Sequence, residues 1–214
     1  MEKATGQHGH GAAAGGDALQ GAAAPGNGGG VNCGAGSFIM HGGTITGNQK
    51  DTNGGGVFVN YGTFNMYGGS ITNNAANSSN KSFGGGVYSQ GTFTMTGGTI
   101  TKNTAKYGAG VWTSTSFTVS GAPTVMRNTR NDDASNVYLG GHTTITIGTG
   151  GLTCANGSIG VTKDPRGHSR GGGSVRAVSR SIRAGDLDGG LTIIFIAPAV
   201  GMRHGAALCQ HQLL

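Results

Sequence analysis

The sequence predicts an all-β chain, a single-stranded parallel β-helix of about four to five coils between poorly structured termini. Three observations predict this fold: a pattern of about 25 residues that recurs four times, an apolar period of two within each copy, and paired glycines between the apolar segments. Repeats of this length without a helical pattern are typical of solenoids, in which each copy forms one coil. The composition agrees, because 46 of the 214 residues are glycine without the period of collagen.

Each copy of the repeat contains three short apolar segments, which we predict to be strands. The first segment begins at a valine after glycine-rich sequence: Val31, Val57, Val87, Val111 and Val137. The second contains an aromatic residue and an apolar residue two positions later: Phe38/Met40, Phe64/Met66, Phe93/Met95 and Phe117/Val119. The third contains one aliphatic residue: Ile45, Ile71, Ile100 and Val125. Because these residues keep a spacing of two, one side of every strand should face a shared core.

Two kinds of turn residue separate the predicted strands. Glycine pairs such as Gly68-Gly69 lie between the second and third strands, where a positive φ permits a sharp change of direction. An asparagine follows each third strand: Asn48, Asn74, Asn103 and Asn128. Asparagine tolerates left-handed backbone geometry, and its amide can bond the same amide one coil away. We therefore expect a structural asparagine ladder inside the solenoid rather than a row of ligand-binding amides.

The repeats cover residues 27–160, and the two ends of the chain do not follow them. Residues 1–26 form a low-complexity segment rich in glycine and alanine, without an apolar stretch of the kind that marks a signal peptide. Residues 161–214 form a basic tail rich in glycine and arginine, which we expect to be disordered or read from a shifted frame. The longest apolar run, residues 191–200, is too short to cross a bilayer, so no transmembrane segment is predicted.

The charge distribution argues against a nucleic-acid partner. The formal net charge is +6, but residues 161–214 carry much of the excess, and the bases of the repeats look scattered along the chain. A phosphate-binding surface needs bases that gather on one folded face. The three cysteines, Cys33, Cys154 and Cys209, are too far apart to form a zinc or redox motif. We expect no cofactor and no metal site.

The landmarks of the repeat, Gly-Gly-x-Val followed by Ile-Thr-x-Asn, resemble the repeats of polymorphic outer-membrane proteins. They are also similar to the related right-handed, pectate-lyase-like β-helix domains of bacterial surface proteins. The resemblance covers residues 27–160, about 60% of the chain. It implies a right-handed helix that serves as a non-enzymatic, adhesin-like display module, located at the cell surface or secreted.

One position of the first strand suggests where such a module would contact a ligand. Phe58 lies between the inward-facing Val57 and Val59, so its side chain should point outward. The same position in later copies is aromatic, which predicts an outward column of Phe58, Tyr88, Trp112 and Tyr138. Exposed aromatic faces bind sugar rings, so host or environmental glycans are the expected partners. A second interpretation stays open, in which the column is a stabilising stack covered by the loop at residues 75–83.

The main alternative function is a polysaccharide lyase or hydrolase, or a remnant that has lost catalysis. Such enzymes gather several carboxylates on one face, with a lysine or arginine as base and often a calcium ion. The acidic residues within the repeats are Asp51, Asp132 and Asp133. Adjacent residues of a strand point to opposite faces, so the Asp132–Asp133 pair would have to lie in a turn to act together. We therefore expect no catalytic residue in this chain.

Two further roles depend on features that repeat without any reactive group. Outward threonines and serines recur on the third strand as Thr44/Thr46, Ser70/Thr72 and Thr99/Thr101, and such rows can order water as ice-binding solenoids do. The row is interrupted in the sequence at Pro123 and Met126, and threonine is also favoured in strands for ordinary reasons. A pure spacer or stalk would require only the scaffold itself.

Overall fold

The computed structural model describes residues 11–13, 18–20, 28–78, 81–115, 117–140, 143, 145–152, 158–161, 176–177, 191–193, 195–196 and 206–208. Within these residues every regular element is a β-strand. Accordingly, no described segment forms a helix that could cross a membrane. Most of the segments 1–26 and 161–214 lies outside the described residues, and so do Cys154 and Cys209.

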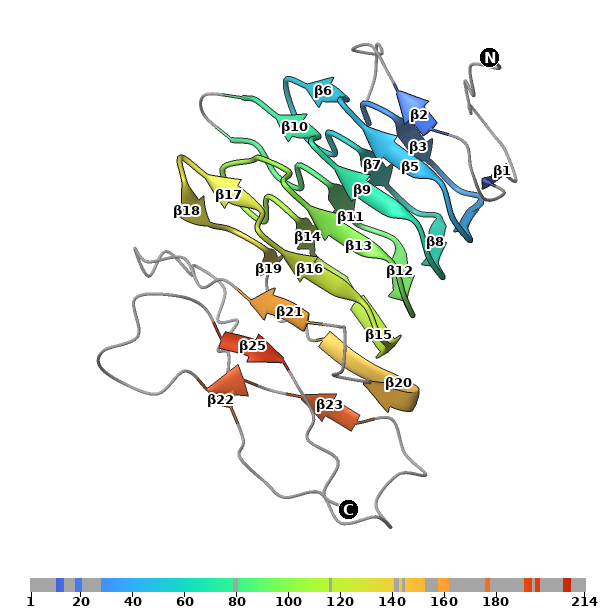
Figure 1. Cartoon of the computed structure of the whole chain (residues 1–214), viewed down its shortest axis with the longest axis vertical. Coiled ribbons are helices and arrows are strands. Elements are labelled where there is room, and N and C mark those ends of the chain that lie inside the picture. The colour runs from blue at the N-terminus through green and yellow to red at the C-terminus, as the bar shows by residue number, and fades with distance from the viewer. Residues whose placement is uncertain are drawn as a thin grey trace.

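Three series of short strands wind into a parallel β-solenoid of about four turns, which confirms the predicted fold class (Figure 1). The first series comprises β3 (Val31–Cys33), β7 (Val57–Val59), β11 (Val87–Ser89), β14 (Val111–Thr113) and β19 (Val137–Leu139). The second comprises β4 (Ser37–Met40), β8 (Thr63–Met66), β12 (Thr92–Met95), β15 (Phe117–Gly121) and β20 (Ile145–Leu152). The third comprises β5 (Thr44–Thr46), β9 (Ser70–Thr72), β13 (Thr99–Thr101), β16 (Thr124–Met126) and β21 (Ser158–Val161).

Shorter strands lie at one corner of the solenoid and at its two ends. The corner holds β6 (Gln49–Lys50), β10 (Ala75–Ala76), β17 (Thr129–Arg130) and β18 (Asp133–Ala134), which follow one edge in Figure 1. At the N-terminal end β1 (Gly11–Ala13) pairs with β4 and β2 (Ala18–Gln20) pairs with β5, both in parallel. At the other end the pairs are antiparallel and involve β22 (Arg176–Ala177), β23 (Leu191–Ile193), β24 (Phe195–Ile196) and β25 (Ala206–Leu208).

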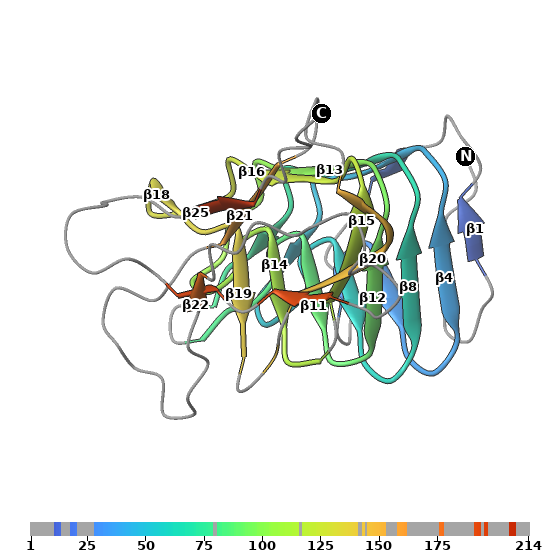
Figure 2. The same cartoon turned by 90° about the horizontal axis from the view of Figure 1, so that it is seen from below.

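Successive coils pair in a register that places equivalent residues of the repeat directly above one another. Val57 pairs with Val87, and Val87 pairs with Val111, in the first series. The second series aligns its phenylalanines in the same way, so that Figure 2 shows β4, β8 and β12 side by side. The register shifts within β15 and β20, between Val119 and Gly121. Each landmark of the sequence therefore becomes a column in space.

The core consists of these columns of apolar side chains. Phe38, Phe64, Phe93 and Phe117 stack with ring centroids 4.8–5.1 Å apart, and the last three are fully buried. Stacked aromatic pairs contribute about 0.5–1.5 kcal/mol each beyond the area that they bury. Methionine, isoleucine and valine columns fill the remaining space. One coil alone would expose most of this surface, so neighbouring coils are required for stability.

A ladder of buried asparagine side chains runs along the inside of one corner. The backbone N–H and the Nδ2 of Asn74 both donate to Oδ1 of Asn103, at 2.9 and 3.0 Å. The same pair of bonds, 2.8–3.1 Å long, joins Asn48 to Asn74, Asn103 to Asn128, and Asn128 to Asn136. Each Nδ2 of Asn74, Asn103 and Asn128 also donates to a backbone carbonyl of the preceding coil, at 2.9 Å. The four asparagines singled out in the sequence thus form continuous hydrogen bonds between coils.

Asn136 is a fifth member of the ladder that the repeat pattern does not identify. It precedes Val137, at the position that glycine takes before the other first-strand valines. A Cβ at those glycines would collide with the ladder: at Gly86 it would lie 2.6 Å from the carbonyl oxygen of Gly110 and 2.9 Å from Nδ2 of Asn103. At the end of the ladder Asn136 supplies the next amide itself. At the opposite end, Oδ1 of Asn48 is buried and accepts no hydrogen bond from the described residues.

Replacing Asn103 by alanine should destabilise the protein strongly. The change removes the acceptor of two Asn74 N–H groups and the donor to the Ile71 carbonyl, all in buried positions. Since each unsatisfied buried group costs about 1–3 kcal/mol, the free energy of unfolding should fall by at least about 3 kcal/mol in urea titrations. Asn77→Ala, which removes an exposed amide, should change it by less than about 0.5 kcal/mol. Equal effects of the two substitutions would contradict a stabilising role for the ladder.

Gly86→Ala should also destabilise, because the added methyl group would overlap the carbonyl oxygen of Gly110 and the amide of Asn103. Overpacking of this kind costs about 1–3 kcal/mol. Gly34 offers the matched control, since a Cβ there would meet no atom within 4 Å. Thermal unfolding of both variants checks the prediction, and a Gly86→Ala protein as stable as Gly34→Ala would contradict it.

Candidate functional site

The predicted aromatic column exists as a stack on the outer side of the first series of strands. The rings of Phe58 and Tyr88 lie 5.0 Å apart at 11°, and those of Tyr88 and Trp112 lie 4.5 Å apart at 5°. The parallel register of β7, β11 and β14 aligns these residues directly. Tyr138 follows Trp112 in the same register, but its ring turns toward Tyr107 instead.

The expectation that the whole column exposes its faces to water is wrong. Phe58 and Tyr88 are only 4% and 6% exposed, and Trp112 and Tyr138 are half-buried. The inward-facing residues on either side of each aromatic residue predict the direction of its side chain, but they do not predict what covers it. Phe58 and Tyr88 are therefore buried outside the main core, and the column retains exposed surface only at its Trp112–Tyr138 end.

Two aromatic residues that the repeat pattern does not single out pack against this end. Phe83 and Tyr107 stack on each other at 5.2 Å, and Phe83 also lies 5.3 Å from Trp112 at a tilt of 53°. Tyr107 meets Tyr138 edge-on at 5.7 Å. Both residues stand four positions before a first-strand valine, and Phe83 ends the predicted loop at 75–83. This shared spacing is the sequence signal that could have identified both residues. We call Phe83, Tyr107, Trp112 and Tyr138 the aromatic cluster.

Two cations lie over the aromatic cluster. The Nζ of Lys106 is 5.9 Å and the Cζ of Arg130 is 5.6 Å from the centre of the Tyr107 ring. At such distances a cation is attracted by the ring, with about 0.5–1 kcal/mol at an exposed site. Tyr107 is thus held by a stacked ring, an edge contact and two cations. This places its ring in a defined orientation at the surface.

The indole N–H of Trp112 is a polar group without a partner. Its Nε1 is shielded from solvent and makes no hydrogen bond to any described residue. A buried donor without an acceptor costs about 1–3 kcal/mol.

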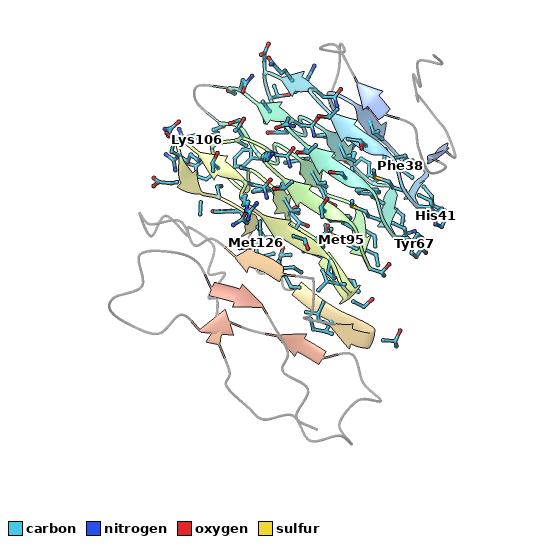
Figure 3. The ribbon with its side chains drawn as sticks, in the orientation of Figure 1. Phe38, His41, Tyr67, Met95, Lys106 and Met126 are labelled. Atoms are coloured by element: carbon cyan, nitrogen blue, oxygen red, sulfur yellow. The ribbon has the colours of Figure 1, made fainter. Side chains whose placement is uncertain are left out.

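All charged side chains between residues 28 and 152 gather at the corner that carries the asparagine ladder. They lie between the residue before each ladder asparagine and the next first-strand valine: Lys50, Asp51, Lys81, Lys102, Lys106, Arg127, Arg130, Asp132 and Asp133. The expectation that the bases of the repeats are scattered is therefore wrong, because bases far apart in sequence recur at one corner of successive coils. We call this corner the charged edge. Figure 3 shows Lys106 projecting from it.

Two carboxylates of the charged edge, Asp132 and Asp133, lie at a tight hairpin. Asp132 and Asp133 are both exposed; Asp132 lies in the two-residue turn between β17 and β18, and Asp133 begins β18, where it stands opposite Arg130. Asn131 and Asp132 have φ of 45° and 68°, as this type of turn requires. Among the residues that the structure describes, no three of His, Cys, Asp and Glu lie close enough to hold a metal ion.

The hydroxyl row of the third strand continues further than the sequence suggests. Thr44, Ser70, Thr99 and Thr124 stand in register on four successive coils. Pro123 precedes the row instead of interrupting it, while Met126 ends the parallel row that contains Thr101. The predicted interruption therefore affects one row and not the other.

Burial shifts the pKa of two side chains near these features. It raises the pKa of the Tyr88 phenol, which lies within the aromatic column. It also raises the pKa of the Cys33 thiol, although backbone hydrogen bonds oppose the shift. A cysteine in this state is a poor nucleophile at neutral pH.

Tyr88 should make stability depend on pH in the alkaline range. Because its pKa is raised in the folded chain, the unfolded chain loses this proton first, and the free energy of unfolding should fall above about pH 10. Tyr88→Phe should lose less stability over that range than the parent protein. Urea titrations from about pH 7 to 11 check this prediction. A constant difference between the two proteins at all pH values would contradict it.

No protein-family model, curated protein or solved structure matches the chain. The fold assignment therefore rests on the structure alone, and the resemblance of residues 27–160 to surface-protein repeats carries only an expectation about function.

Proposed function

We propose that this chain is a non-enzymatic, adhesin-like β-solenoid that contacts carbohydrate through the aromatic cluster. The observation that carries the proposal is a set of four aromatic rings that pack together at the charged edge while each stays partly accessible to solvent. Sugar rings present C–H faces that pack against aromatic side chains, and hydroxyl groups that need hydrogen-bond partners.

The aromatic cluster offers both kinds of contact. Trp112 and Tyr138 belong to regular strands. Trp112 pairs with Tyr88 on one side and with Tyr138 on the other, so strand pairing holds the backbone of both residues in place. Rigid placement lowers the entropy lost when a ligand binds. The guanidinium of Arg130, which lies over the Tyr107 ring, supplies donors for ligand oxygens.

Several features favour display over catalysis. Hydrolysis of a glycosidic bond needs two carboxyl groups on either side of the bond. Near the aromatic cluster, Asp132 and Asp133 are adjacent and exposed at one hairpin rather than facing each other across a groove. A regular solenoid with a binding cluster on one corner suits a module that holds a ligand. Location at a bacterial cell surface or in the medium is part of the proposal and follows from the resemblance of the repeats.

Trp112 is the single tryptophan of the chain, so its fluorescence reports directly on the aromatic cluster. A glycan that binds there should change the Trp112 emission, and Tyr107→Ala should weaken that binding at least about tenfold, or about 1.4 kcal/mol. Candidate glycans come from an array and are then titrated in solution. Asn77→Ala, at the same edge but outside the cluster, should bind like the parent protein. Array-positive glycans that leave the emission unchanged, or bind Tyr107→Ala equally well, would contradict the proposal.

A further inference from the structure

The outer side of β8 combines exposed aromatic ends with a polar centre. Burial alternates strictly from Tyr61 to Tyr67: Gly62, Phe64 and Met66 are buried, and the residues between them are not. Four side chains in this stretch therefore point outward, namely Tyr61, Thr63, Asn65 and Tyr67. Tyr61 is 82% and Tyr67 is 50% exposed, and they are the large apolar side chains that the described part of the chain leaves most open to solvent.

His41 extends the aromatic surface at one end. The imidazole of His41 and the ring of Tyr67 are stacked, with centroids 4.9 Å apart and planes at 10°. The register of β4 and β8 makes the two residues neighbours, because each follows a methionine of the pair Met40 and Met66. Figure 3 shows both side chains projecting together from the ends of their strands. The contact with His41 restricts the orientation of the Tyr67 ring.

No Lys, Arg, Asp or Glu lies on this side of the solenoid within the described strands. All nine charged side chains between residues 28 and 152 belong to the charged edge. The outward neighbours of β8 are Ser37 and Ile39 on β4, and Thr92 and Thr94 on β12. The surface therefore contains no carboxylate, ammonium or guanidinium group but is rich in hydroxyl and amide groups.

We propose that this surface, the β8 face (Tyr61, Thr63, Asn65, Tyr67 and His41), binds a neutral polysaccharide. The two tyrosines flank the four residues of β8, and a separation of six residues limits the distance between their backbones to at most about 20 Å. An extended sugar chain can lie along β8, with a ring against Tyr61, a ring against Tyr67, and its hydroxyl groups over Thr63 and Asn65. The proposal goes beyond the function proposed above, because it concerns a different side of the molecule and does not require the aromatic cluster to bind anything.

Charge decides the class of partner. A nucleic acid, an acidic polysaccharide or an anionic membrane gains its affinity from lysine and arginine, which the β8 face does not contain. An apolar protein surface would leave the outward hydroxyl and amide groups of β8 without partners, at a cost in free energy. A neutral glycan matches both properties, since it is uncharged and carries alternating C–H and hydroxyl surfaces.

The test uses the full chain with microcrystalline cellulose, chitin, polygalacturonate beads and duplex DNA as probes. We expect retention on cellulose or chitin that does not weaken when NaCl is raised to about 1 M, because the contact contains no ion pair. Tyr61→Ala and Tyr67→Ala should each weaken retention about tenfold, which corresponds to about 1.4 kcal/mol, and the double variant should lose it. Tyr61→Phe and Tyr67→Phe keep the rings and should bind like the parent protein. Gln90→Ala, an exposed polar residue of the next coil, is the surface control.

Thermal unfolding of every variant verifies that the fold is intact, which is expected because both tyrosines are exposed. Absence of retention on cellulose and on chitin, or equal retention of the double alanine variant, would overturn the proposal. Retention on polygalacturonate or DNA alone would place binding at the charged edge and would also overturn it. Soluble oligosaccharides of the retained polymer should leave Trp112 emission unchanged. A change that disappears in Tyr107→Ala would assign the polymer to the aromatic cluster instead, so the two proposals can fail separately.

Discussion

Amide-to-amide hydrogen bonds between successive coils hold the solenoid in one register, and the other columns of the molecule depend on that register. Each ladder asparagine donates twice to the next one, and each interior amide also bonds a backbone carbonyl. A coil displaced by one residue would leave these buried groups unpaired and turn its apolar side chains outward. The phenylalanine stack in the core and the aromatic column outside it both require that coils stay aligned.

Because the coils are aligned, charged and uncharged side chains occupy different sides of the solenoid. The repeat places lysine, arginine and aspartate only between the residue before its ladder asparagine and the next first-strand valine, which gives uncharged sides and one charged edge. The aromatic cluster and the β8 face therefore have different electrostatic environments. The aromatic cluster lies beside Lys106 and Arg130, whereas the β8 face has no charged neighbour. Under the two proposals, ligands of different charge would bind different sides of the solenoid.

The sequence predicted what repeats and could not predict what occurs once. The three strands of each coil, their inward residues and the bonded asparagines all follow from landmarks present in four copies. The repeat pattern does not identify Phe83, because this residue belongs to the longest coil and its packing against Trp112 is a tertiary contact. Tyr61 and Tyr67 occupy positions that are not aromatic in most other coils, so a periodic pattern gives them no weight. Asn136 replaces a glycine, and only the end of the ladder makes room for its side chain.

The corner that holds the charged edge is also where the coils differ in length. From the first-strand valine to the ladder asparagine every coil has 16 or 17 residues, but from that asparagine to the next valine the number ranges from 8 to 13. The ladder closes the main core before the chain enters this variable stretch, which buries a separate cluster of small side chains, Ala76, Ala105 and Ala109. Because Asn77 is exposed, foreign peptides inserted after it would not displace these buried side chains. The same property lets such a protein acquire new surface loops, coil by coil, without redesign of its interior.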